Sequence, residues 1–455
     1  MAQDLFEDFP RPTKEDWINR ITKDLKGKEF NHLISESAED IAIQPVYHIA
    51  DGTPAYQPFR KEAGWSIVQE ILVMNTSTAN KEALDHLSRG ADALLFYLPQ
   101  GIDLKVLLQD ILIQHIRVHF VTEGKGLEIA IQLNKIIRER ALDPASVQGS
   151  INIDALENIA RTGNWFQSRQ ADMAELKKLT DTCPENIKSL CLNANLFCNA
   201  GATLDQQLGI ILSMAYEYIH ELELTHAGKF WINKGIGSDY FGEIASLRAL
   251  RRVWSQLLEE LQIPDSPLHI YAETGLRNKT ILDAYNNMIR SSAEAMAAGI
   301  GGCDEFSAKG FDQTFREPTA FGERVAKNQQ SIFQHESYLD KVRDISKGSY
   351  FIEELTEELA TRGWAFFKAI EAEGGYIKAL ENGWLQMQLE EKAKQEEAAF
   401  KAQSKTLIGA NKYLKQDENL KDLIEQGHFY KIPLGKTTLN PVKVKRLSEE
   451  LEKDQ

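Results

Sequence analysis

The sequence predicts an α/β fold, and its eight strand-then-helix steps favour a closed (β/α)8 barrel with the helices outside. The strand-like segments are short apolar runs, and they fall at 66–74, 93–99, 118–122, 149–153, 189–193, 229–233, 269–273 and 297–303. Amphipathic stretches such as 79–90 (ANKEALDHLSRG) and 204–223 lie between them. The periodicity alone also fits an open doubly wound sheet, so the count of eight is what favours the barrel.

An N-terminal arm, residues 1–61, is expected to precede the barrel. Apolar residues recur at nearly helical spacing between 17 and 25, and Gly27 then ends this helix. Prolines keep the rest of the arm extended or turning. The larger apolar residues of the arm include Leu5, Phe6, Phe9, Trp17, Phe30 and Leu33. They are too sparse for a core of their own, so the arm is expected to lie on the barrel or on a partner.

The barrel is expected over 62–345, and helices over 346–415 are expected to pack on it. One face of the first of these helices carries Phe351, Leu355, Leu359, Phe366 and Ile370 at helical spacing. A second, more polar helix begins near residue 384. The remaining residues, 416–455, form a charged tail with one apolar part.

The composition indicates a soluble protein of the cytoplasm. The net charge of −15 argues against binding to nucleic acid or to an anionic membrane, because both surfaces attract basic proteins. No apolar run is long enough to span a bilayer, and the acidic N-terminus does not resemble a secretory signal. The four cysteines form no C-x-x-C pair, so the sequence predicts neither a disulfide framework nor a metal site.

Three long segments resemble the methylmalonyl-CoA mutase family. Residues 284–350 hold a small-residue helix with a Gly-Ile-Gly-Gly turn, 348–360 read GSYFIEELTEELA, and 231–254 read WINKGIGSDYFGEIASLRALRRVW. The resemblance covers 15–413, with many segments in the same order. It implies a TIM barrel, and a family chemistry that uses adenosylcobalamin radicals on acyl-CoA substrates.

Two positions that are catalytic in this family carry different residues here. The family pattern W-T-I-R-Q-Y matches 65–70 (WSIVQE), so Glu70 stands at the position of its tyrosine. The pattern G-Y-H-M-Q-E-A-G-A matches 194–202 (ANLFCNAGA), where Leu196 replaces a histidine and can neither donate a hydrogen bond nor move a proton. Arg161 lies one residue away from the family's substrate-carboxylate arginine. The resemblance therefore implies no catalytic residue in this chain, with Glu70 and Leu196 as degenerate positions.

The tail does not resemble the cobalamin-binding domain of the family's catalytic chain. That domain carries the motif D-x-H-x-x-G, whose histidine ligates cobalt, and none of the ten histidines here stands two positions after an aspartate. His428, in EQGHFYK, has no matching context. The stretch after 408–414 (IGANKYL) is also too short for a doubly wound domain. We therefore expect that this chain alone binds neither cobalamin nor a metal.

Together these differences are typical of the family's small subunit, a non-catalytic paralogue. The resemblance implies a heterodimer with a catalytic large subunit, which holds adenosylcobalamin and interconverts (R)-methylmalonyl-CoA and succinyl-CoA in propionate metabolism. Two alternatives stay open. The first is a stand-alone barrel enzyme acting on an acyl-CoA, with Glu70 and Glu273 as candidate acid and base, although Glu273 also fits a salt-bridged barrel residue. The second is an active barrel that uses a separately encoded cobalamin domain.

Overall fold

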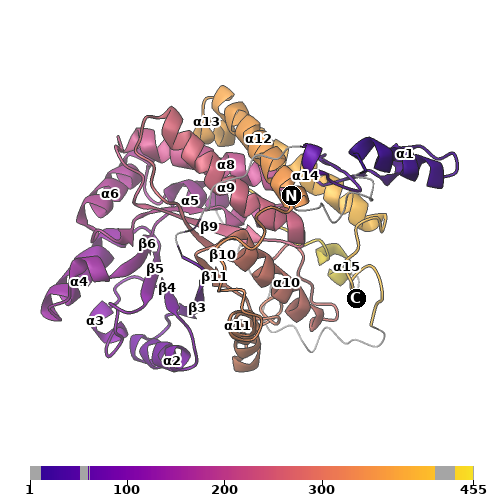
Figure 1. The fold of residues 1–455 in the computed structure, drawn as a ribbon. Coiled ribbons are helices and arrows are strands. Elements are labelled where there is room, and N and C mark those ends of the chain that lie inside the picture. Colours follow the sequence, from indigo (N-terminus) through magenta and orange to yellow (C-terminus); the bar gives the residue numbers. More distant parts are fainter. Residues whose placement is uncertain (1–11, 52–59, 61, 416–435, 454–455) are drawn as a thin grey trace, which may run out of the picture.

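The barrel strands of the computed structural model are β3 (Ser66–Leu72), β4 (Ala93–Leu98), β5 (Arg117–Thr122), β6 (Gln148–Asn152), β7 (Ile187–Lys188), β8 (Leu190–Asn193), β9 (Phe230–Ile236), β10 (His269–Thr274) and β11 (Glu305–Ser307). Hydrogen bonds place them in the order β7-β6-β5-β4-β3-β11-β10-β9-β8, with every neighbouring pair parallel (Figure 1). Only Ser189 separates β7 from β8, so they form one interrupted strand through which the ring closes. The predicted parallel barrel is therefore confirmed. The structure describes residues 12–51, 60, 62–415 and 436–453.

Helices cover the outside of the ring. They are α2 (Thr76–Ser88), α3 (Leu104–Leu107), α4 (Gly126–Glu139), α5 (Ala155–Thr162), α6 (Arg169–Thr182), α7 (Asn195–Asn199), α8 (Leu204–Glu221), α9 (Tyr240–Glu260), α10 (Asn286–Gly301) and α11 (Ala320–His335), with a 3-10 turn η3 (Pro144–Ser146). In α4, Ile129, Leu133 and Ile137 recur every four residues and are buried, while most of the charged residues are not. The main apolar core lies between the ring and these amphipathic helices.

The predicted eighth strand, 297–303, is wrong. These residues form the end of α10 and its cap, and the strand is instead β11. Small residues let this end of α10 pack closely, since a Cβ on Gly299 would lie 2.6 Å from the ring of Trp65. Gly302 then ends the helix in the left-handed conformation, with φ 94°. A short run of small apolar residues fits a buried strand and a buried helix equally well, which explains the error.

Three helices that follow the barrel pack on its outer layer: α12 (Tyr350–Ala372), α13 (Tyr376–Glu381) and α14 (Trp384–Lys401). α12 crosses α8, and two glycines allow the close approach of the helices. A Cβ on Gly209 would lie 2.7 Å from the backbone nitrogen of Phe367, and a Cβ on Gly363 would lie 2.7 Å from the Cβ of Leu208. Larger residues at either glycine would push the two helices apart.

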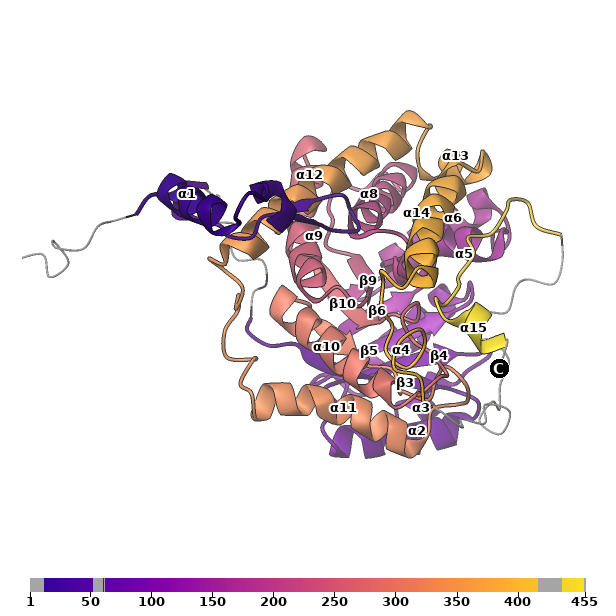
Figure 2. The same cartoon turned by 90° about the vertical axis from the view of Figure 1, so that its right-hand side faces the viewer.

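The arm contains α1 (Lys14–Asp24), η1 (Phe30–Leu33), the hairpin strands β1 (Ser35–Glu36) and β2 (Ala42–Ile43), and η2 (Ile49–Asp51). Figure 2 shows α1 standing away from the barrel, and none of its residues is buried. The hairpin is docked on the body of the chain, where Ile41 is buried and Glu39 Oε1 accepts a hydrogen bond from Leu204 N (3.1 Å). Three apolar residues of the predicted arm, Leu5, Phe6 and Phe9, lie outside the described residues.

The last described segment, residues 436–453, ends in α15 (Glu449–Lys453) and lies against the loops at the carboxyl ends of the strands (Figure 2). Leu439, Val442 and Leu447 are buried there. The apolar part of the predicted tail, with His428, falls outside the described residues. Within the described parts of the chain, every helix is too short or too polar to cross a bilayer.

Candidate functional site

The carboxyl ends of the barrel strands surround a cavity of about 600 Å³. Its walls come from the ends of β3 to β6 and β8 to β10, and from α5 and α7. Barrels of this architecture hold their ligands at this end, because the loops that follow the strands converge there. The cavity also contacts three residues that the sequence singled out, Arg161, Leu196 and Glu273, and is therefore the candidate site.

Glu70 and Glu273, the two carboxylates considered as an acid and base pair, meet at one lysine. Lys309 Nζ contacts both carboxylate oxygens of Glu70 and lies 2.6 Å from Glu273 Oε2. The order of the strands explains the meeting. β11, which precedes Lys309, lies between β3 and β10, which carry the two glutamates. The sequence-predicted pair is thus brought together, but around a cation.

Hydrogen bonds fix Glu70 further. Tyr97 Oη donates to Glu70 Oε2 (3.1 Å) and Tyr271 Oη donates to Glu70 Oε1 (2.7 Å). Burial raises the pKa of Glu70, but the charge of Lys309 and the hydrogen bonds from Lys309 and Tyr271 outweigh it, so the pKa lies below its ordinary value. A carboxylate with a lowered pKa is a weak base at neutral pH, so Glu70 is poorly suited to general base catalysis.

Lys309 is correspondingly held as a cation. Burial lowers its pKa, but the charges of Glu273 and Glu70 outweigh this effect and raise the pKa well above its ordinary value. Glu273 Oε1 in turn accepts hydrogen bonds from Asn233 Nδ2 (2.8 Å) and from Asn195 Nδ2. Both oxygens of Glu273 therefore have partners, as expected for a salt-bridged structural carboxylate.

Leu196 belongs to α7 and lines the same cavity. Its side chain is 5% exposed and packs into the main apolar core. The neighbouring Asn195 supplies the polar contact to Glu273 instead. At this point of the wall the cavity thus offers an aliphatic surface and no proton donor or acceptor.

Arg161 lines the cavity from the last turn of α5. Its Nε donates to Glu157 Oε1 (2.8 Å) and its Nη2 donates to Asn158 Oδ1 (3.2 Å), so the guanidinium is tied to its own helix. Burial raises the pKa of Glu157 to about 7, and the charge of Arg161 opposes this rise. The arginine therefore serves an internal ion pair in this structure.

The axis of the barrel is filled just below the candidate site. One buried residue from each strand position contributes to this axial plug, which consists of Val68, Leu95, His119, Ser150, Cys191, Trp231, Tyr271 and Glu305. Each of them is at most 4% exposed. The Trp231 and Tyr271 rings stack with centroids 4.9 Å apart, and His119 stacks on Trp231 at 5.4 Å. These side chains pack against one another across the axis at this level, as is general for barrels of this architecture.

Glu305 organises the polar half of the plug. Its carboxylate lies 3.1 Å from His119 Nε2 and 2.9 Å from His269 Nε2, and Arg117 Nε is 3.7 Å away. Burial raises the pKa of Glu305, but His119 and His269 outweigh it and hold the pKa well below its ordinary value. Ser150 Oγ contacts the second ring nitrogen of His119 (2.9 Å). The group is a satisfied internal network.

Sequence reasoning missed Lys309 and the plug residues. One available signal was the polar residue at alternate positions of otherwise apolar strands, as with Arg117 and His119 in β5. A period of two points such residues to one face of the strand, which here is the inside of the barrel. Lys309 gave no such signal, because it follows β11 in a loop.

The sequence pattern that defines the methylmalonyl-CoA mutases matches residues 97–449. The chain belongs to the methylmalonyl-CoA mutase family. The methylmalonyl-CoA mutase small subunit of Porphyromonas gingivalis is 32% identical, over 84% of this chain and 66% of that protein. The small subunit of Streptomyces virginiae is 28% identical, over 83% and 67%. The methylmalonyl-CoA mutase of Escherichia coli is 27% identical, over 90% and 65%, so the chain spans about two thirds of the length of these relatives.

The residues of the candidate site do not fit the cobalamin that the mutase family implies. None of the described histidines lines the cavity, so no described imidazole is placed to ligate cobalt there. Among the described residues, no three His, Cys, Asp or Glu side chains gather in a way that could hold a metal ion. His119 and His269 instead contact Glu305 inside the barrel.

Proposed function

We propose that this chain is the small subunit of a methylmalonyl-CoA mutase, a non-catalytic barrel that pairs with and stabilises a catalytic large subunit. The large subunit holds adenosylcobalamin, and the assembled enzyme interconverts (R)-methylmalonyl-CoA and succinyl-CoA in the propionate metabolism of the cytoplasm. The carboxylate pair is the observation that carries the proposal, because Lys309 is bound to both Glu70 and Glu273, and Leu196 gives the cavity wall no proton donor or acceptor. The two relatives named as small subunits support the same assignment.

The first prediction is that the isolated chain neither binds methylmalonyl-CoA saturably nor isomerises it. The Glu70→Tyr, Leu196→His double variant should be equally inactive, since restoring those two side chains supplies no cobalamin-binding domain. Isothermal calorimetry and a coupled assay measure both properties, with the co-expressed two-subunit complex as the positive control. Saturable binding or turnover by the isolated chain would favour the stand-alone barrel enzyme. Turnover only with an added cobalamin-domain protein would favour the split enzyme.

Helix α1 supports an interface at the arm. Trp17, Ile18 and Ile21 share one side of this helix and are only partly covered by their own chain. Full burial of an exposed side chain of this size is worth roughly 1.5–3 kcal/mol, and covering the part of each that is still exposed contributes a fraction of that before ordering costs. The docked hairpin that includes Ile41 anchors the arm to the barrel, so α1 is presented outward from a fixed base.

The second prediction is that replacing this apolar face weakens the heterodimer. The Trp17→Ala, Ile21→Ala variant should raise the dissociation constant for the large subunit by about 30-fold or more, equivalent to roughly 2 kcal/mol. The matched control is Asn19→Ala, Lys23→Ala, on the exposed side of the same helix. Analytical ultracentrifugation or interferometry measures both constants. Equal affinity of the two variants would remove α1 from the interface and leave the barrel and the C-terminal helices to carry the pairing.

A further inference from the structure

Residues 436–453, called the strap below, run across the carboxyl end of the barrel. Their backbone amides bond to three elements that follow barrel strands, namely α5 with its cap, α7, and the loop after β10. Thr438 N and Val442 N donate to Gly163 O (2.9 Å) and Ala160 O (2.7 Å), at the end of α5. Lys445 N donates to Asn199 O (3.3 Å) at the end of α7, and Leu447 N donates to Arg277 O (2.9 Å) after β10. The strap thus ties together elements that are distant in sequence.

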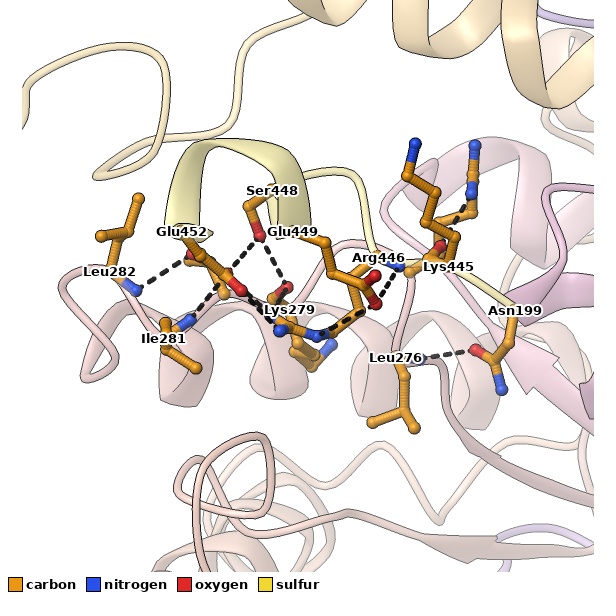
Figure 3. A network of polar contacts seen from close by, with 12 residues as sticks. Asn199, Leu276, Lys279, Ile281, Leu282, Lys445, Arg446, Ser448, Glu449 and Glu452 are labelled. Carbon is orange, nitrogen blue, oxygen red and sulfur yellow. Dashed lines mark hydrogen bonds and ion pairs between the residues drawn. The ribbon is translucent and has the colours of Figure 1, made fainter. Parts of the chain in front are cut away.

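The end of the strap is locked by Glu452, as Figure 3 shows. The carboxylate accepts hydrogen bonds from Ile281 N (3.1 Å), Thr280 Oγ1 (2.9 Å) and Ser448 Oγ (2.6 Å), and it forms an ion pair with Arg446. Ser448 Oγ also contacts the Lys279 carbonyl (3.3 Å). The side chain of Glu452 thus holds the end of the strap on the loop that follows β10.

The body of the chain is shaped to receive the strap. Gly163 has φ 75°, and a Cβ there would lie 2.5 Å from the carbonyl oxygen of Leu439, so the strap approaches where only glycine leaves room. Arg277 is buried and donates from Nη1 to Lys445 O (2.8 Å) and from Nε to Glu396 Oε2 of α14 (2.6 Å). It thus clamps the strap to α14. Apolar contacts of Leu439 and Val442 with the main core complete the docking.

A chain of contacts leads from the strap to the candidate site. Lys445 N bonds to the backbone of Asn199, whose Nδ2 donates to Asn195 Oδ1 (3.0 Å). Asn195 in turn donates to Glu273, which lies against Lys309. Asn199 Oδ1 also accepts from Leu276 N (2.7 Å) (Figure 3). The strap therefore contacts α7 directly, and α7 is the helix that supplies Asn195 and Leu196 to the wall of the cavity.

We propose that residues 436–453 are an intramolecular strap that holds α7 and the loop after β10 closed over the β8 to β10 side of the barrel mouth, and that release of the strap opens this side of the cavity. The strap also lies at the face at which barrels of this architecture bind ligands. Its basic residues face acidic residues of α14, with Lys445 Nζ 3.0 Å from Glu397 Oε2 and Lys443 Nζ 3.5 Å from Glu390 Oε1. High salt should therefore favour release.

The test compares a strap-release variant, Val442→Asp, Leu447→Asp, with the control Asn440→Asp, at an exposed residue of the same segment. Hydrogen–deuterium exchange of the full chain should be about tenfold faster at 195–200 and 276–282 in the release variant, with β3 to β5 unchanged. Labelling of Cys198 in α7 by N-ethylmaleimide should accelerate likewise, while Cys191 in the axial plug stays unlabelled. The control should match the native chain in both measurements.

A milder variant, Glu452→Gln, should give the same local pattern with a smaller amplitude, and it guards against general unfolding of the double variant. Unchanged exchange at 195–200 and 276–282 while the strap itself exchanges freely would overturn the proposal, because α7 would then be held without the strap. Fast exchange of the strap amides in the native chain would also overturn it. So would faster exchange throughout the barrel in both variants, since the strap would then be part of the common core.

Discussion

Replacing Lys309 with methionine is expected to lower the free energy of unfolding by roughly 3–5 kcal/mol. The substitution keeps the length and the apolar stem of the side chain but removes the cation that Glu70 and Glu273 share. Those carboxylate side chains are only 15% and 6% exposed, so the variant would bury two negative charges close together without compensation. Urea denaturation followed by circular dichroism, with an unchanged m value, measures the loss.

A second substitution separates this electrostatic cause from a loss of packing. In the double variant Lys309→Met, Glu70→Gln, a neutral amide replaces one of the two carboxylates. The double variant should therefore be clearly more stable than Lys309→Met alone. The control Lys443→Met changes an exposed lysine and should stay within about 0.5 kcal/mol of the native chain. If Lys309→Met unfolds at the same urea concentration as the native chain, the ion pairs with Glu70 and Glu273 do not form in solution.

The fold could be predicted from the sequence wherever the residues of a strand were themselves typical of a buried strand. The runs that became β3 to β6 and β8 to β10 are short and apolar, and amphipathic stretches separate them, so their places along the chain were evident. β11 has only three residues and begins with the charged Glu305, whereas the more apolar run just before it belongs to α10. The end of α10 packs tightly against Trp65, which is distant in sequence. The local sequence pattern therefore could not show that 297–303 is helical.

The candidate site was only partly predictable, for a different reason. Glu70 and Leu196 could be found because they stand at positions of two family sequence patterns, and Glu273 because it ends a strand-like run. The partnership of Glu70 with Lys309 joins residues 239 positions apart and exists only because the ring closes between β3 and β11. The axial plug likewise depends on which residues point inward at one level of the barrel, as His119 and Trp231 do. Such contacts depend on how the barrel closes and on the register between neighbouring strands. The sequence of a single strand specifies neither.

Glu305→Gln is expected to cost roughly 3 kcal/mol at neutral pH and progressively less as the solution is made acidic. The buried carboxylate contacts His119, His269 and Arg117, and the Trp231 indole N–H lies 3.5 Å away. Because the folded-state pKa of Glu305 lies well below its ordinary value of 4.5, its ionised form favours the folded state. That contribution is fully present above the unfolded-state pKa, and it is lost as the pH falls through the depressed folded-state pKa.

The measurement is therefore the difference in free energy of unfolding between the native chain and Glu305→Gln, followed from pH 7 downward to the acid limit of the folded state. The difference should stay flat above about pH 5 and shrink below it, because only the native chain then has to take up the extra proton on unfolding. Glu223→Gln, at a carboxylate whose side chain is 84% exposed, should show a small difference without this slope. A difference for Glu305→Gln that stays constant or grows toward acid pH would mean that this carboxylate is not held ionised inside the barrel.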